Sequence, residues 1–135
     1  MDILAIQGSP RKNGNTDIVL DWTLDALRDT TQAHVEKVYV RDLDIGGCIE
    51  CFACQKVVDK PGCSVKDDMI ELYDKILAAD LVVYASPVFC WGMTAQIKAV
   101  FDRLYATFKF NQEPYVSMLK GKRGALIVTA GGTRD

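Results

Sequence analysis

Histidine is nearly absent from this chain of 135 residues, in which His34 is the single example. A Ser-His-Asp triad, or a metal site with several histidines, would have to be built around that one residue, so hydrolytic chemistry is disfavoured. The chain also lacks an excess of one charge, because 16 Lys and Arg residues face 18 Asp and Glu residues and the net charge is -2. Such a balance gives no field that would attract a polyanion, and we expect no nucleic-acid partner.

Long hydrophobic runs are missing as well. The apolar runs are strand-sized, as at residues 81–87, whereas a membrane span needs about 20 residues. The N-terminus has neither the basic start nor the long apolar stretch of a secretory signal. We therefore predict no membrane partner and a cytoplasmic location for a single domain over residues 1–135, in which 49% hydrophobic residues are enough to build a core.

Short β-branched apolar runs alternate with longer segments of helical periodicity, a pattern that is typical of α/β folds. The predicted strands are Ile3–Ile6, Val35–Val40, Leu81–Ala85 and Ala125–Thr129. The predicted helices run from Thr16 as N-cap to Asp29, from Asp68 as N-cap through Leu77 with Glu71 as its capping-box partner, and over about Met93–Phe108. Because each helix lies between two strands, the crossovers should be right-handed and the sheet parallel.

Several finer expectations concern the surface of this fold. The second strand carries charged residues and is predicted to be an edge strand. The fourth is an apolar strand at an open edge, which indicates either a fragment of a longer chain or a partner subunit that covers it. The first helix is expected to bury one apolar face, made of Ile18, Val19, Trp22, Ala26 and Leu27. A solvated basic face is expected around the turn before the fourth strand, at Lys109, Lys120, Lys122 and Arg123.

The loop Gly8–Thr16, with the sequence GSPRKNGNT, joins the first strand to the first helix. Backbone N–H groups at a helix N-terminus, the helix dipole and hydroxyl or amide side chains favour anion binding at such a place. The loop matches neither GxxxxGK[ST] nor GxGxxG, so a single phosphate monoester fits better than ATP or a dinucleotide. A plain turn capped by Thr16 is the alternative.

Four of the five cysteines fall within sixteen positions, in a predicted cysteine-rich insertion at about residues 44–66. Cys48, Cys51 and Cys54 form a C-x2-C-x2-C run, and Cys63 follows. In a reducing compartment such a cluster indicates metal binding and not disulfides. The spacing is similar to ferredoxin-type runs that hold a [4Fe–4S] cluster, while a zinc site and free thiols remain open as alternatives. Cys90 stands apart and is expected to pack as a small hydrophobe.

Four segments in the same order resemble the flavodoxin-like NAD(P)H-dependent FMN reductases, and especially their iron-sulfur flavoprotein branch. They are Gly8–Thr16, the cysteine run with Gly62-Cys63 and Lys66–Met69, the segment Ala79–Phe89, and Lys98–Arg103. The likeness covers essentially the whole chain. It implies an α/β, flavodoxin-like, doubly wound parallel sheet of strand order 2-1-3-4, with the usual fifth strand missing from this chain.

The resemblance also implies which residues hold FMN. Those at the phosphate are Ser9, Arg11, Asn13, Asn15 and Thr16. Those at the ring are Pro87, Val88, Phe89, Trp91, Gly92 and Met93 after the third strand, and Thr129, Ala130, Gly131 and Gly132 after the fourth. Phe89 and Trp91 are candidate walls for the flat ring, although aromatic residues at such places can also pack on their own helix.

The function implied is an FMN-dependent oxidoreductase that takes hydride from NAD(P)H and passes electrons on singly through a [4Fe–4S] cluster held by Cys48, Cys51, Cys54 and Cys63. No catalytic acid or base is assigned, because hydride transfer itself needs none. Two alternatives stay open: a cluster-free NAD(P)H:FMN or quinone reductase, and a non-catalytic metal-binding or interaction module on the same scaffold. The expected partners are a nicotinamide, a small-molecule or protein electron acceptor, and further copies of the chain in a homodimer or homotetramer.

Overall fold

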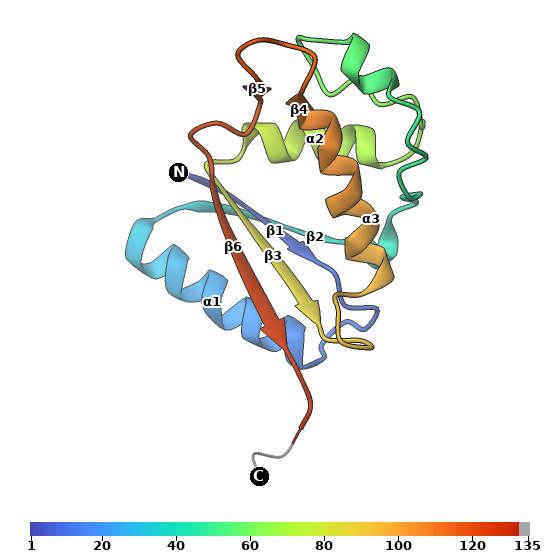
Figure 1. The fold of residues 1–135 in the computed structure, drawn as a ribbon. Helices are drawn as coiled ribbons and strands as arrows, with labels where there is room; N and C mark the ends of the chain where they lie inside the picture. Colours follow the sequence, from blue (N-terminus) through green and yellow to red (C-terminus); the bar gives the residue numbers. More distant parts are fainter. Residues whose placement is uncertain (133–135) are drawn as a thin grey trace.

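A four-stranded parallel sheet forms the centre of the computed structural model, which describes residues 1–132 (Figure 1). Its strands are β1 (Asp2–Gln7), β2 (His34–Tyr39), β3 (Leu81–Pro87) and β6 (Arg123–Thr129), in the order β2-β1-β3-β6. Ile3 lies opposite both Val35 and Leu81, and Val83 lies opposite Ala125. The predicted flavodoxin-like α/β sheet, its parallel pairing and its order are confirmed. The charged second strand is an edge strand, as its sequence indicates.

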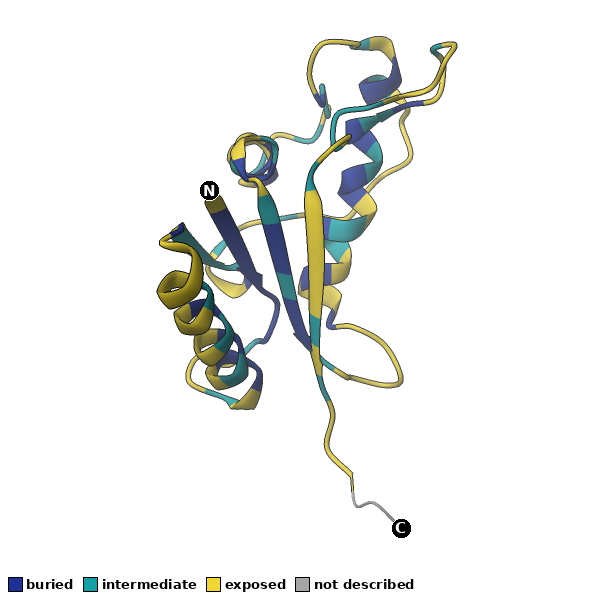
Figure 2. Ribbon diagram, turned by 90° about the vertical axis from the view of Figure 1, so that its left-hand side faces the viewer, coloured by how far each residue is buried: buried dark blue, intermediate teal, exposed yellow. Residues whose placement is uncertain are grey.

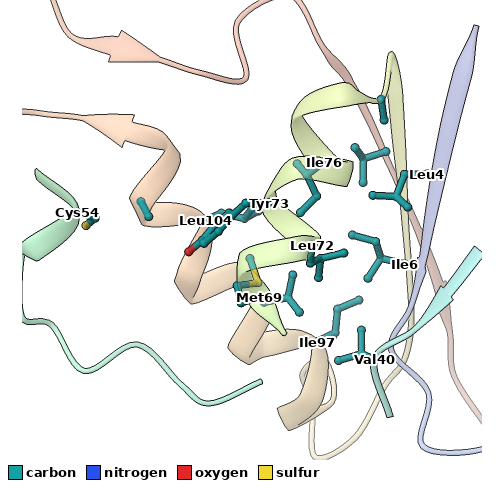
Figure 3. Packing of buried hydrophobic residues seen from close by; sticks show 14 residues of the cluster. Leu4, Ile6, Val40, Cys54, Met69, Leu72, Tyr73, Ile76, Ile97 and Leu104 are labelled. Carbon is teal, nitrogen blue, oxygen red and sulfur yellow. The ribbon is translucent and has the colours of Figure 1, made fainter. Parts of the chain in front are cut away.

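Helices cover both faces of this sheet because the strands are apolar on both sides. Helix α1 (Asn15–Thr31) packs on one face, where Leu20 and Leu24 meet Ile3 and Ala5 of β1. Helices α2 (Met69–Ala78) and α3 (Ala95–Arg103) cover the other face (Figure 1). There the alternate β1 residues Leu4 and Ile6 pack against α2, with Leu72 and Ile76 close by (Figure 3). Each such buried side chain stabilises the fold by about 1.5–3 kcal/mol.

Helix α1 begins at a different residue, and buries a different face, than the sequence predicts. Gly14 is its N-cap, and Thr16 lies inside the first turn, so Thr16 as N-cap was wrong. Trp22, expected in the buried face, is 69% exposed, and Ile18 is exposed as well. The helix is rotated because Asp17 points inward to an ion pair with Lys37 of β2, at 2.5 Å between Oδ1 and Nζ. That pair places Leu20 and Leu24, and not Trp22, against the sheet.

The other two helices are also capped in unexpected ways. Asp68 is the N-cap of α2, but its side chain makes no capping bond, so the predicted capping box with Glu71 is wrong. Instead Asp67 Oδ1 accepts a hydrogen bond from the N–H of Met69 at 3.1 Å. Helix α3 is shorter than the predicted Met93–Phe108, since the side chain of Thr94 caps it by accepting from the N–H of Ile97.

After α3 the chain forms short elements that the sequence did not predict. They are the 3-10 helix η3 (Leu104–Thr107) and the antiparallel strands β4 (Phe108–Lys109) and β5 (Val116–Ser117). The long connection from β2 to α2 begins with the 3-10 helix η1 (Val40–Asp42) and contains a second one, η2 (Ala53–Lys56). None of the helices within residues 1–132 is both long and apolar enough to cross a membrane.

Strand β6 is the outermost strand on its side of the sheet, and Figure 2 shows it as a mostly exposed ribbon beside the buried β1 and β3. Leu126 and Val128 are 56% and 55% exposed. Within residues 1–132 no strand pairs with the free side of β6. The apolar open edge expected from the sequence is therefore present in the structure.

Candidate functional site

A cleft of about 220 Å³ opens at the carboxyl ends of β1, β3 and β6. Its lining comes from the loops after these three strands: Ser9, Arg11, Asn15, Thr16, Pro87, Val88, Phe89, Thr129, Ala130 and Gly131. Every one of these residues belongs to the predicted cofactor set. In an open α/β sheet, ligands bind at this end, where the strand order changes direction beside β1. The fold thus brings together three segments that are far apart in the sequence.

The phosphate side of the cleft is built by the turn from β1 into α1. No side chain caps α1, so the N–H groups of its first turn remain available to an anion. Ser9 and Thr16 are buried, and the hydroxyl of Thr16 lies 2.6 Å from that of Thr129 on β6. Two hydrogen bonds fix Ser9. Its N–H donates to Gln7 Oε1 at 2.5 Å, and its Oγ accepts from the N–H of Arg11 at 3.2 Å.

Gly8 is the point at which this turn touches the rest of the sheet. Its N–H donates to the carbonyl of Ala85 at 2.8 Å, and its own carbonyl accepts from the hydroxyl of Thr94 at 2.6 Å. A Cβ atom at position 8 would lie 2.6 Å from Cβ of Ile97 and 3.0 Å from the oxygen of Ala85. Glycine is therefore required here by the close approach of the loop to α3 and β3.

The ring side of the cleft is shaped by a tight turn after β3. Phe89 and Gly92 exchange backbone hydrogen bonds at 2.8 and 3.0 Å, and Cys90 and Trp91 at the tip have φ angles of 45° and 66°. Phe89 lies at the cleft, whereas Trp91 is 100% exposed and lies outside its lining. Cys90 is exposed at the tip of the turn, so its expected packing as a small hydrophobe is wrong.

Five predicted cofactor residues are not part of the lining: Asn13, Trp91, Gly92, Met93 and Gly132. Asn13 adopts a left-handed φ of 58°, and its N–H donates to Asp17 Oδ2 at 2.7 Å instead of facing the cleft. Contact of these residues with a cofactor stays a prediction.

Asp17 packs against the turn from β1 into α1, called here the phosphate turn, and the sequence did not predict this role. It is fully buried beneath the turn, where it pairs with Lys37 and accepts from the hydroxyl of Tyr39 at 3.2 Å. Burial raises the pKa of its carboxyl, but hydrogen bonds from Lys37 and from the N–H of Asn13 outweigh that effect, and the pKa is lowered overall. The carboxylate thus stays charged and fixes the turn.

We expect Asp17→Asn to lower the free energy of unfolding by about 3 kcal/mol at neutral pH, because it removes the buried partner of Lys37 and leaves that mostly buried charge with the exposed Asp21 alone. A lowered pKa in the fold means that this stabilisation is present above the ordinary value of 3.8 and is lost as the pH falls below it. Urea unfolding of the wild type and the variant, at neutral pH and again below pH 3.8, measures the difference in their free energies of unfolding. This difference should be smaller in acid. Asp21→Asn, at an exposed second partner of Lys37, is the control with a small effect; equal losses for both variants would contradict this account.

A second cavity, of about 380 Å³, lies between η3 and the connection that carries the clustered cysteines. Its lining includes Cys48, Cys51, Cys54 and Cys63, together with Phe52, Arg103 and Tyr105. Residues 44–66, called here the cysteine loop, run beside α3 toward β4 and away from the carboxyl ends of the strands (Figure 1). The fold therefore gathers all four predicted ligands around one space. Within residues 1–132, no three Cys, His, Asp or Glu side chains converge closely enough to hold a single metal ion.

The four thiols differ in their surroundings. Cys48 and Cys51 are exposed, Cys63 is half-buried and Cys54 is buried. The Cys51 Sγ lies 3.0 Å from Oγ of Ser64. Hydrogen bonds from Ser64 and from the N–H of Ala53 lower the pKa of the Cys51 thiol. That environment favours the thiolate, which is the form that binds metals.

Two buried cations hold the cysteine loop, and the sequence analysis anticipated neither. Lys109, predicted on a solvated face, is 1% exposed, and its Nζ donates to the carbonyls of Cys54, Pro61 and Ala106 at 2.9, 3.1 and 2.9 Å. These three acceptors compensate for the loss of water around the ammonium group. Arg103 of α3 is also 1% exposed and pairs with Asp67 at 2.6 Å.

The family described as NADPH-dependent FMN reductase matches residues 1–135. An iron-sulfur flavoprotein of Methanosarcina thermophila is 33% identical over 135 residues, which are 100% of this chain and 65% of that protein. One from Archaeoglobus fulgidus is 37% identical over 132 residues, which are 98% of this chain and 56% of that protein. This chain thus spans less than two thirds of the length of either relative.

Solved structures show the same fold at low sequence identity. The azoreductase AzrA aligns with a TM-score of 0.75 and 17% identity, over 98% of this chain and 70% of that one. An apo NADH:FMN oxidoreductase, EMOB, aligns with a TM-score of 0.65 and 22% identity, over 97% of this chain and 59% of that one. At these identities the likeness is one of fold.

Proposed function

The chain belongs to the NADPH-dependent FMN reductase family, and we propose that it is an oxidoreductase that binds FMN, takes hydride from NAD(P)H and passes electrons on through a [4Fe–4S] cluster. The observation that carries the first part is the cleft at the carboxyl ends of β1, β3 and β6, lined by predicted cofactor residues only. The four cysteines around a second cavity support the other part.

The cleft suits FMN on its phosphate side. Arg11 contributes a cationic side chain, Ser9 and Thr16 contribute hydroxyls, and the uncapped first turn of α1 contributes N–H groups. Charge-assisted hydrogen bonds of this kind fit a phosphate monoester. We assign these residues to binding of the cofactor phosphate.

The ring would lie between the loops after β3 and β6. Phe89 supplies an aromatic surface, and Ala130 and Gly131 allow close backbone approach. The N–H groups of Phe89 and Gly92 bond each other's carbonyls, so the donors that we assign to the ring's polar edge are the N–H groups of Ala130 and Gly131, which line the cleft. The loop after β3 is joined to β6 by the hydrogen bond from the N–H of Val88 to the carbonyl of Thr129, at 2.8 Å.

When bound, FMN supplies the hydride acceptor and a [4Fe–4S] cluster supplies transfer of single electrons. The chain itself binds and orients these groups. Four cysteines line one cavity of about 380 Å³, and their C-x2-C-x2-C spacing is the reason that we assign a cluster here and not a lone zinc ion. The names of the relatives, iron-sulfur flavoprotein, agree with this assignment.

We further propose a homodimer or homotetramer, an NAD(P)H partner, and a small-molecule or protein electron acceptor. Support for assembly comes from the apolar, exposed face of β6 at Leu126 and Val128. A cysteine run that holds a metal cluster suits a reducing compartment, and we propose a cytoplasmic location on that ground. Light scattering that shows a stable monomer under assay conditions would contradict the assembly.

Replacing Arg11 by alanine tests the phosphate site. We expect affinity for FMN to fall about tenfold to hundredfold, because one charge-assisted contact is worth about 1.5–3 kcal/mol. Affinity for riboflavin, which lacks the phosphate, should stay unchanged; fluorescence titration of both flavins measures the two values. Lys12→Ala removes a neighbouring charge that pairs with Asp42 outside the cleft and serves as the control. Equal loss for both flavins, or for both variants, would place the phosphate elsewhere.

A further inference from the structure

The base of the cysteine loop is closed by hydrogen bonds between its two ends. The N–H of Asp68 donates to the carbonyl of Asp44 at 3.0 Å, and the N–H of Asp44 donates to Asp68 Oδ2 at 2.7 Å. Beside this pair, the N–H of Gly46 donates to Asp67 Oδ2 at 2.9 Å. The entry and exit of the loop are thus joined before the first cysteine and after the last one.

Arg103 joins this closed base to α3. Its Nη1 donates to Asp67 Oδ2 at 2.6 Å and to the carbonyl of Gly46 at 3.1 Å, and its Nη2 donates to Asp67 Oδ1 at 3.0 Å and to the carbonyl of Val65 at 3.3 Å. The backbone carbonyl of Arg103 accepts from the hydroxyl of Tyr73 at 2.6 Å, which fixes the end of α3 against α2. One side chain therefore contacts both ends of the loop.

Arg103 also lines the cavity that the cysteines surround, together with Cys48, Cys51, Cys54 and Cys63. Its Nε is buried and has no hydrogen-bond acceptor among residues 1–132, although its other two nitrogens are fully engaged. An unpaired buried donor is costly, and this one lies in a residue that lines the cysteine cavity.

We propose that Arg103 is the positioning residue of the cysteine site: it locks the two ends of the cysteine loop together and places a buried positive charge beside an anionic group held by the four thiolates. This inference rests on the proposed [4Fe–4S] cluster and names the residue that sets its electrostatic environment. Asp67 balances part of the charge, and Lys109 holds the outer part of the loop through backbone carbonyls.

The charge has a definite effect on the reduction potential. Each electron added to a cluster with four thiolate ligands makes an anionic group more negative. A nearby buried cation stabilises the reduced form more than the oxidised form, and net charge is among the factors that set the potential of such clusters. Removing the cation should lower the potential, and removing its compensating carboxylate should raise it.

The test compares the cluster potential of the wild type with those of three variants and one control variant, each reconstituted anaerobically. Arg103→Gln is expected to lower the potential by about 59 mV, a tenfold change in the equilibrium constant of a one-electron couple. Asp67→Asn is expected to shift it in the opposite direction. Arg103→Lys keeps the charge but loses the forked contacts, so it should loosen the loop, seen as faster limited proteolysis, with a smaller shift in potential. Lys120→Gln removes an exposed charge with no such contacts and is the matched control.

Opposite shifts for Arg103→Gln and Asp67→Asn support the inference, because a merely structural defect would not reverse its sign between two members of one ion pair. Unchanged potentials in both variants, or shifts of the same sign, would overturn it. If Arg103→Gln does not fold, a raised potential in Asp67→Asn together with faster limited proteolysis of Arg103→Lys supports the inference, and the absence of either overturns it. Iron counted in the wild-type chain separates the two claims: a wild type without iron refutes the proposed cluster itself, and the inference with it.

Discussion

Cys51→Ser is expected to reduce the iron and acid-labile sulfide of the anaerobically purified protein from about four per chain to almost none. Cys51 lines the shared cavity, and its hydrogen bonds favour the thiolate. A serine hydroxyl at that position stays protonated and is a much poorer ligand for iron. Because Cys51 is exposed and not part of the core, the metal-free variant should unfold at the same denaturant concentration as the metal-free wild type.

Cys90→Ser is the control for this experiment. Cys90 is also exposed, but it lies in the turn after β3 and not at the cysteine cavity. We expect its iron content and its electronic spectrum to match those of the wild type. Full iron retention in Cys51→Ser would contradict the ligand assignment. A wild type with about one zinc and no iron would identify a zinc site, and one without metal would leave a cluster-free reductase.

Gly8→Ala is expected to destabilise the fold by about 1–3 kcal/mol and to weaken FMN binding at least tenfold. The added Cβ would lie 2.6 Å from Cβ of Ile97 and 3.0 Å from the carbonyl oxygen of Ala85. Neither atom is the free end of a flexible side chain, so the loop has to move away from α3. That movement would pull the phosphate turn out of the geometry set by Gly8, Thr94 and Ala85.

Urea unfolding and FMN titration measure the two effects together. Gly124→Ala is the matched control, since a Cβ at that position on β6 meets no atom within 4 Å. It should change stability by less than about 0.5 kcal/mol and leave flavin affinity unchanged. If Gly8→Ala binds FMN as tightly as the wild type, the close approach of this loop is not needed for the site.

The arrangement of the main strands could be predicted because a parallel strand buried on both faces has a nearly continuous apolar sequence. Residues 3–6 and 81–85 show that pattern plainly, and the loops that follow such strands must meet at one edge of the sheet. Topology thus predicts that the loops after these strands meet, while the choice of Ser9, Phe89 and Thr129 within the loops came from the family resemblance.

Buried charges could not be predicted in the same way. Asp17, Arg103 and Lys109 look like surface residues in the sequence, since charged residues are rarely buried unless they are paired. Their partners lie far along the chain: Arg103 pairs with Asp67, and Lys109 donates to the carbonyl of Cys54. Only the folded chain shows such pairs. The rotation of α1 that exposes Trp22 has the same origin, in the ion pair of Asp17 with Lys37.

Adding NADPH, and separately NADH, to the FMN-loaded protein without oxygen, while the flavin absorbance is recorded, tests the proposed oxidoreductase most directly. We predict that at least one nicotinamide bleaches the flavin band faster than it bleaches free FMN at equal concentration, and that Arg11→Ala slows this step only below saturating FMN. A protein that binds no FMN, or that holds FMN which neither nicotinamide reduces faster than free FMN, would contradict the proposed oxidoreductase.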